Sequence, residues 1–92
     1  MTERHIERNL KREVEKRGGM ALKFISPSMS GVPDRLVLIQ HGRACFVELK
    51  APGKPLRTLQ RYRKRQLESL GFEVWVIDSM EGIETFLREV ME

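Results

Sequence analysis

Residues 31 to 50 read GVPDRLVLIQHGRACFVELK, and this stretch decides the fold that we expect for the chain. It contains two apolar runs, residues 35–40 and 43–49, each long enough for a core strand. Only His41 and Gly42 separate the runs, and a connection this short favours an antiparallel hairpin. The stretch therefore predicts two neighbouring strands that pair across a tight turn.

Both strands meet charged residues at their outer ends. Side chains alternate along a strand, so Glu48 and Lys50 share a face with Phe46. An ionised carboxylate on a covered face costs on the order of several kcal/mol unless a cation or a proton compensates it. In a hairpin centred on residues 41 and 42, residue 48 lies opposite residue 35, which brings Asp34 within one residue of Glu48.

Two adjacent carboxylates and one amine leave negative charge to be balanced. Hard oxygen ligands of this kind suit Mg²⁺ or Mn²⁺, which bind through one or two carboxylates and leave positions for water and phosphate. A second interpretation stays open at this point. In it Lys50 forms a structural ion pair with one acid, and Asp34 is an ordinary turn residue after Pro33.

The rest of the chain predicts three helices and two further strands around the hairpin. We expect a helix over residues 2–17 capped by Thr2, a strand over 20–25, loops over 26–33 and 51–55, a helix over 58–70, a strand over 72–77 and a last helix capped by Ser79. The passage from residue 43 to 77 is long enough for a parallel crossover, whereas the hairpin is antiparallel. The order αβββαβα thus predicts an α/β fold with a mixed sheet flanked by helices on both faces.

The first helix offers acids beside its apolar stripe. Ile6, Leu10 and Val14 recur at helical spacing and define that stripe. At 100° per residue Glu7 falls on its border, while Glu3 lies nearer the middle but in the first turn.

The second helix is expected to bury Leu59, Leu67 and Leu70. On this construction Gln60 lies at the border of the stripe and Arg63 lies inside it. For Glu7 and Gln60 alike, the alternative is a border residue turned to solvent. Together with the charges at the strand ends, they favour a convergent site.

Length and composition favour one domain over residues 1–92. The chain is 40% hydrophobic and 33% charged, as in an ordinary globular protein. It has neither the roughly 20 apolar residues of a membrane span nor the apolar core of a secretory signal, so we expect a cytoplasmic protein that does not enter a membrane. The net charge is +4, and residues 50–65 carry several cations and no acid. Either a phosphate-facing surface or a solvated helix face would account for that segment.

The charged positions match a known pattern. Pro-Asp at 33–34, thirteen residues, then Glu-Leu-Lys at 48–50 and a Gln at 60 resemble the PD-(D/E)XK nuclease superfamily, whose core is αβββαβ. GVPDRLVL and FVELKAPGK resemble its VRR-NUC branch in particular, and the resemblance extends from about Glu3 to Ile77. The first helix is also similar to that of archaeal Holliday-junction resolvases. The resemblance implies a restriction-endonuclease-like core followed by a C-terminal helix.

The resemblance also implies an activity and the residues that carry it. The activity is that of a metal-dependent, structure-selective DNA endonuclease that hydrolyses phosphodiester bonds with Mg²⁺, or with Mn²⁺ as a substitute. The implied catalytic residues are Glu7, Asp34, Glu48, Lys50 and Gln60. Asp34, Glu48 and the carbonyl of Leu49 would bind the metal, and Glu7 would contact it directly or through water. Lys50 would orient or activate the attacking water, and Gln60 would support the site. Whether Glu3 or Glu7 is the helical ligand stays open.

The implied substrate is branched DNA. Stand-alone members of this branch are similar to resolvases that act as two-fold dimers, so we expect a homodimer that resolves four-way (Holliday) junctions. A flap nuclease, a restriction-type nuclease and a catalytically inert DNA-binding module are the alternatives. The resemblance further suggests a bacterial or phage-encoded protein. The residues expected to contact DNA are Lys23, Ser26, Arg35, Lys54, Arg57, Arg61 and Lys64.

Overall fold

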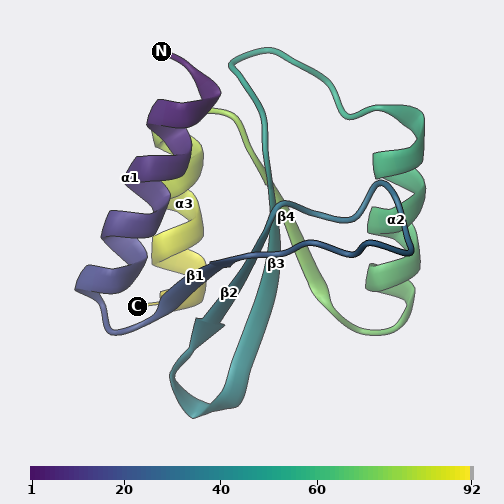
Figure 1. Ribbon diagram of the computed structural model, residues 1–92. Coiled ribbons are helices and arrows are strands. Elements are labelled where there is room, and N and C mark those ends of the chain that lie inside the picture. The colour runs from purple at the N-terminus through teal and green to yellow at the C-terminus, as the bar shows by residue number, and fades with distance from the viewer. Residues whose placement is uncertain (92) are drawn as a thin grey trace.

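Three helices flank a four-stranded sheet in the computed structural model, which describes residues 1–91 (Figure 1). The elements are α1 (Glu3–Lys16), β1 (Met20–Lys23), β2 (Arg35–Ile39), a 3₁₀ turn (Gln40–Gly42), β3 (Arg43–Leu49), α2 (Thr58–Ser69), β4 (Glu73–Ile77) and α3 (Met80–Met91). The expected αβββαβ core with a C-terminal helix is confirmed. Within residues 1–91 no helix combines the length and the apolar character that crossing a membrane requires.

The sheet has the order β1-β2-β3-β4. β1 pairs with β2 and β2 with β3 in antiparallel fashion, whereas β3 and β4 run parallel. α2 supplies the crossover between these last two strands, as the length of residues 43–77 predicted. The sheet is therefore mixed.

The hairpin turn differs from the expected one by a single residue. Ile39 pairs with Arg43, so the loop has three residues rather than two. Gln40 joins the turn, and His41 and Gly42 both adopt positive φ angles, of 69° and 75°. As a result the register shifts by one residue from the predicted one, and its continuation places Asp34 directly opposite Glu48.

One face of the sheet is covered by α1 and α3, which also pack against each other (Figure 1). Cys45, Val47 and Leu49 of β3 point into this layer and are fully buried. The largest buried side chain is Phe86 of α3, whose ring lies 5.3 Å from that of Trp75 in an edge-to-face arrangement. This layer is the hydrophobic core.

The opposite side of the sheet is covered only in part. α2 lies on that side and contacts β4 (Figure 1). Its leucine stripe is not buried as predicted, because Leu59 is 42% and Leu70 73% exposed. The residue that α2 buries is Gln60, at 7% exposure. The helix is held against the loop before β2 instead, where Arg63 Nε donates a hydrogen bond to the carbonyl of Ser30 at 2.8 Å.

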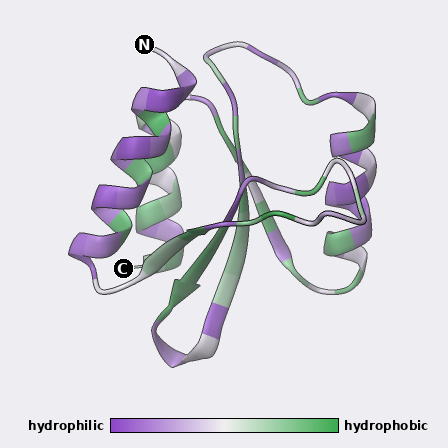
Figure 2. Ribbon diagram, viewed as in Figure 1, coloured by the Kyte–Doolittle hydropathy of each residue, from purple (hydrophilic) through white to green (hydrophobic). Residues whose placement is uncertain are grey.

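Apolar side chains remain partly exposed where α2 does not reach. Met20 and Leu22 on β1, Val76 on β4 and Phe72 just before it are between 39% and 52% exposed. The strands that carry this side are coloured largely as hydrophobic in Figure 2. The expected cover of helices on both faces is thus complete only on the side of α1 and α3.

Candidate active site

Asp34 and Glu48 face each other across the β2–β3 ladder at the end of the sheet where β3 finishes. Asp34 comes just before β2, and its Oδ2 accepts a hydrogen bond from the backbone N–H of Leu49 at 3.0 Å. Its own carbonyl accepts a bond from the N–H of Phe24 at 2.8 Å, which ties it to the end of β1 as well. The first bond fixes the carboxylate beside Glu48, and the second fixes the backbone that carries it.

Glu48 is 4% exposed and has two further polar neighbours. Gln60 Nε2 donates a hydrogen bond to Glu48 Oε2 at 2.8 Å, and Lys50 Nζ lies 4.0 Å from the same oxygen. The amide of Gln60 is held in turn, because its Oε1 accepts a bond from the N–H of Arg57 at 2.9 Å. The structure therefore brings Asp34, Glu48, Lys50 and Gln60 together, as the strand and helix patterns predicted.

The environment of Glu48 opposes its ionisation. Burial and, after it, the negative charge of Asp34 raise the pKa of Glu48 from 4.5 to about 7, against the lowering effect of Lys50. A hydrogen bond with Asp34 and the charge of Glu3 also raise this pKa. The single nearby amine does not balance the acids, so the site has an excess of negative charge that a bound cation would relieve.

The acids of α1 reach the same end of the sheet. Glu3, Glu7 and Asp34 line one cavity of about 320 Å³ together with Lys23, Phe24 and Ile25. Glu7 Oε2 lies 3.1 Å from Arg35 Nη2, so its charge is paired within the structure. Glu3 makes no such pair among residues 1–91, and its charge acts on Glu48. Both acids thus lie beside β2 and β3. Among the described residues the charge of Glu7 is paired with Arg35, whereas the charge of Glu3 has no such partner.

Arg35 does not lie on the surface, where a phosphate contact was expected. It is 8% exposed, and its Nη1 donates a hydrogen bond to the carbonyl of Ala21 at 3.0 Å. The sequence contained a signal for this position, because Arg35 shares a strand face with Val37 and Ile39 and so points to the covered face. A buried guanidinium bound to the main chain and to Glu7 is not available to a DNA backbone in this structure.

Most of the other residues expected to contact DNA lie on the surface. The side chains of Lys23, Lys54, Arg57 and Arg61 are exposed, and Ser26 is half-buried. Lys64 Nζ is paired with Glu68 at 2.9 Å. Arg63, which sequence reasoning placed among the buried leucines, instead ties α2 to the loop before β2. The position of Arg63 within the leucine stripe of the helix was only a weak indication of its contact with Ser30.

The donor set suits a hard divalent cation that keeps part of its water shell. Within residues 1–91 no three side chains of His, Cys, Asp or Glu are grouped closely enough to hold a metal by themselves. Mg²⁺ nevertheless usually keeps several waters and is bound through one or two carboxylates, so a larger cluster is not required. Asp34, Glu48 and the carbonyl of Leu49 can supply these oxygens.

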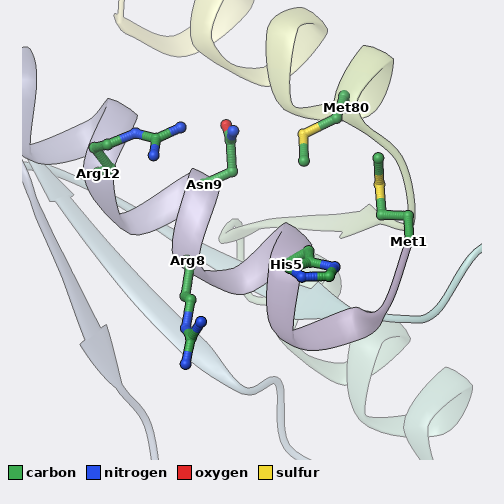
Figure 3. A pocket seen from close by; sticks show the side chains of 6 residues that line it. All are labelled: Met1, His5, Arg8, Asn9, Arg12 and Met80. Atoms are coloured by element: carbon green, nitrogen blue, oxygen red, sulfur yellow. The ribbon is translucent and has the colours of Figure 1, made fainter.

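A larger hollow lies elsewhere, over α1 and the start of α3 (Figure 3). It measures about 470 Å³ and is lined by Met1, His5, Arg8, Asn9, Arg12 and Met80. His5 is engaged with Thr2 at the start of α1, where its N–H donates to the Thr2 hydroxyl at 3.2 Å. None of the acids expected in the site lines this hollow, so we place the candidate site at the strand ends.

Comparison with known proteins bears on the family and the fold of the chain. No family model matches the sequence. The chain is 47% identical over 76 residues to a protein of Acyrthosiphon pisum secondary endosymbiont phage 1 named "Putative nuclease p44", covering 83% of this chain and 82% of the phage protein. A solved structure described as a VRR_NUC domain superposes with a TM-score of 0.90 at 24% identity, over 98% of this chain and 99% of that one. The chain therefore belongs to the same family as this phage protein, which is named as a nuclease, and it has the fold of the VRR_NUC domain.

Proposed function

We propose that residues 1–92 form one nuclease domain that hydrolyses phosphodiester bonds in DNA with the help of a divalent metal ion. The observation that carries this proposal is the direct opposition of Asp34 and Glu48 across the hairpin, with Lys50 beside them. The phage relative is named as a nuclease, which supports the reaction class. Mg²⁺ is the metal we propose, with Mn²⁺ as a substitute.

Each residue has a defined part in this reaction. Asp34, Glu48 and the Leu49 carbonyl would hold the cation, which supplies Lewis-acid polarisation of the scissile phosphate and eases loss of a proton from water. Lys50, 4.0 Å from Glu48, would orient the attacking water and stabilise the charge that develops on the phosphate. Gln60 would keep the Glu48 carboxylate in one orientation through its 2.8 Å bond.

The helical acid of the site is proposed to come from α1. Glu7 and Glu3 line the same cavity as Asp34. We keep Glu7 as the ligand, direct or through water, because its paired carboxylate is already held in place. Glu3 acts on Glu48 through its charge and is the alternative.

Exposed cations on and before α2 would contact the DNA backbone. Lys54, Arg57 and Arg61 form no ion pair within residues 1–91, so their charges are available to phosphates. Lys23 lines the cavity beside Asp34, and Ser26 follows it in the chain. Because phosphate contacts carry no base sequence, they favour recognition of DNA by shape, and we propose branched DNA as the substrate.

We further propose that two copies act together on a four-way junction. A domain of this size covers little DNA, and two sites related by a two-fold axis can cut opposing strands. The partly exposed apolar side chains of Met20, Leu22 and Val76 offer uncharged surface for such an association. Sedimentation at micromolar concentration should give twice the chain mass of 10.8 kDa, whereas a monomer would contradict the dimer alone. We place this activity in the cytoplasm of a bacterial cell.

The substrate is tested with labelled single-stranded, duplex, flap and four-way DNA incubated with Mn²⁺, with Mg²⁺ or with chelator. We expect cleavage that requires the metal and is fastest on the four-way junction. Faster cleavage of the flap or of linear duplex would instead support the flap or restriction-type alternative. Cleavage that persists in chelator would contradict metal dependence.

A catalytically inert DNA-binding module is the second candidate, and the incomplete carboxylate cluster is the observation that favours it. Calorimetric titration with Mn²⁺ separates the two. A nuclease of the proposed kind should bind Mn²⁺ in a manner that Glu48→Gln abolishes, whereas an inert module should show no Mn²⁺ binding that depends on Glu48.

A further inference from the structure

Arg35 is a buried cation directly beside the candidate site. Within residues 1–91 the buried polar and charged residues are Arg35, Glu48 and Gln60. Glu48 and Gln60 bond each other inside the site. The third member of this set follows Asp34 in the chain but points to the opposite face of the sheet, beneath α1. Its position calls for an explanation of its own.

The guanidinium of Arg35 joins two elements. Its Nη1 donates to the carbonyl of Ala21 in β1 at 3.0 Å, and its Nη2 lies 3.1 Å from Glu7 Oε2 in α1. Its backbone continues directly from Asp34, which is itself fixed to β1 and β3. The planar fork of one side chain therefore sets the distance between the helical acid and the strand acid.

Stability alone gives a poor account of this arrangement. Arg35 Nε is buried and has no hydrogen-bond partner among the described residues. The other inward positions of β2 are occupied by Val37 and Ile39, which pack in the core without any such deficit. A buried ion pair with an unpartnered donor is weak evidence for stabilisation, since apolar residues of similar volume often serve as well or better.

We propose that Arg35 is a positioning residue, which holds the Glu7 carboxylate at the cavity beside Asp34 and thereby raises the affinity of the site for a divalent cation. Without that hold, Glu7 is a half-buried helical side chain with several rotamers, and fixing it on cation binding would cost conformational entropy. This inference rests on the proposed function, because it assumes that the cavity beside Asp34 takes a cation.

Charge and position act on cation binding in opposite directions. Removing the positive charge of Arg35 would favour a cation, whereas releasing Glu7 would disfavour it. Arg35→Lys keeps the charge but loses the fork that spans Ala21 and Glu7, so it reports on position alone. Glu7→Asp leaves Arg35 intact and withdraws the carboxylate by one methylene group, which provides a second variant on the half-buried side of the pair.

The test is calorimetric titration of the whole protein with Mn²⁺, without DNA. We compare the unmutated chain with Arg35→Lys, Glu7→Asp, Glu7→Gln and the double variant Arg35→Lys with Glu7→Gln. Arg43→Lys is the matched control, because Arg43 Nη2 also pairs with a carboxylate, Glu73 at 2.6 Å, but at the turn end of the hairpin. Thermal unfolding in chelator shows that each variant is folded.

Arg35→Lys and Glu7→Asp should each weaken Mn²⁺ binding about 10-fold, the lower end of what loss of an orienting partner costs a metal site. The double variant should bind no more weakly than Glu7→Gln alone, and Arg43→Lys should bind as the unmutated chain does. Unchanged or tighter Mn²⁺ binding by folded Arg35→Lys and Glu7→Asp would overturn the inference, as would additive losses in the double variant. If the unmutated chain binds no Mn²⁺, both the proposed function and this inference fail. If it binds Mn²⁺ and the Arg35 and Glu7 variants bind equally well, the inference alone fails.

Discussion

At Glu48 an ionised carboxylate, which the proposed metal binding needs, lowers the stability of the fold. Its carboxylate is buried beside Asp34, and its pKa is raised from 4.5 to about 7. Because the folded chain binds this proton more tightly than the unfolded chain, ionisation costs stability. The cost is absent below about pH 4.5, grows as the pH rises, and is complete above about pH 7. The proposed cation site would account for a buried acid of this kind.

Glu48→Gln should therefore stabilise the metal-free protein at high pH. The amide keeps the shape of the side chain and can still accept a hydrogen bond from Gln60. We expect a gain on the order of 2 kcal/mol in the free energy of unfolding at pH 8, and a smaller gain at pH 5. Urea denaturation in chelator at the two pH values measures both. Parallel stability profiles for the two proteins would show that Glu48 does not titrate as described.

Gln60→Leu should impair the reaction more than the fold. It removes the donor at 2.8 Å from Glu48 Oε2, so the ionised carboxylate loses a partner and its orientation. Cleavage should fall about 10- to 100-fold, the usual cost of removing a group that orients a metal ligand. The pH at which the rate rises should also move upward, because the neutral form of Glu48 is then favoured.

Gln66→Leu on the same helix is the control for this change. Gln66 is exposed and bonds Arg63 and Tyr62 rather than Glu48. Its replacement should leave both the rate and the pH profile unchanged. Equal effects of the two substitutions would mean that Gln60 acts only through the stability of α2.

At single positions the sequence predicted that the strand acids lie together, as the structure has them, but it misplaced Arg35. Asp34, Glu48 and Lys50 could be recognised because strand alternation and charge are both visible in the sequence. Arg35 was grouped with the surface cations because of its charge, although it shares a strand face with the buried Val37. The pairing of Arg35 with Glu7 depends on how closely α1 lies to β2. A local sequence pattern does not contain that distance.

At the scale of elements, α2 packs closely against the loop before β2 at Gly31. Gly31 has a φ of +84°, and a Cβ atom there would lie 2.7 Å from Leu59 Cγ and 3.1 Å from the Leu59 carbonyl. Gly31→Ala should therefore push α2 away from the loop and displace Gln60. We expect a loss of about 1–3 kcal/mol in the free energy of unfolding, combining backbone strain with overpacking. Denaturation in urea measures this loss, and the cleavage rate should fall with it.

Gly53→Ala separates strain from contact. Gly53 has a similar φ of +78°, but a Cβ atom there would meet nothing within 4 Å. This variant should lose only the part of the stability that is due to backbone strain, and it should keep its cleavage rate. Identical losses in both variants would indicate that the contact with Leu59 is unimportant.

Element types and most boundaries followed from the sequence, but the arrangement of two elements did not. β3 has the predicted bounds because its apolar run is sharply ended by charges. The hairpin register was off by one residue, because the residue type of Gln40 does not show that it joins His41 and Gly42 in the turn. The buried face of α2 was misassigned because polar contacts with Glu48 and Ser30, rather than leucine packing, set its orientation.

At the scale of the whole molecule, the exposed cations should set the dependence of DNA binding on salt. Each phosphate contact that is lost reduces the slope of log affinity against log salt by about 0.9 for duplex DNA. Replacing Lys54, Arg57 and Arg61 together by Ala should therefore lower the slope by about 2 to 3 and weaken binding to all sequences alike. Fluorescence anisotropy at several salt concentrations measures this slope.

Arg88→Ala controls for a general change in net charge. Arg88 is exposed on α3, on the side of the sheet away from α2 (Figure 1). Its loss should leave the slope nearly unchanged. A slope that changes equally for every cation removed, wherever it lies, would contradict a defined DNA surface beside the site.

The central claim is that the hairpin makes a metal-dependent hydrolytic site by bringing Asp34 opposite Glu48. The most direct measurement is the single-turnover rate of cleavage of a labelled four-way DNA junction in Mn²⁺ by the unmutated chain, by Asp34→Asn and by the exposed control Glu89→Gln. We predict that Asp34→Asn is slower on the order of 10²-fold or more while Glu89→Gln is unaffected. Folded Asp34→Asn that cleaves as fast as the unmutated chain would contradict the account.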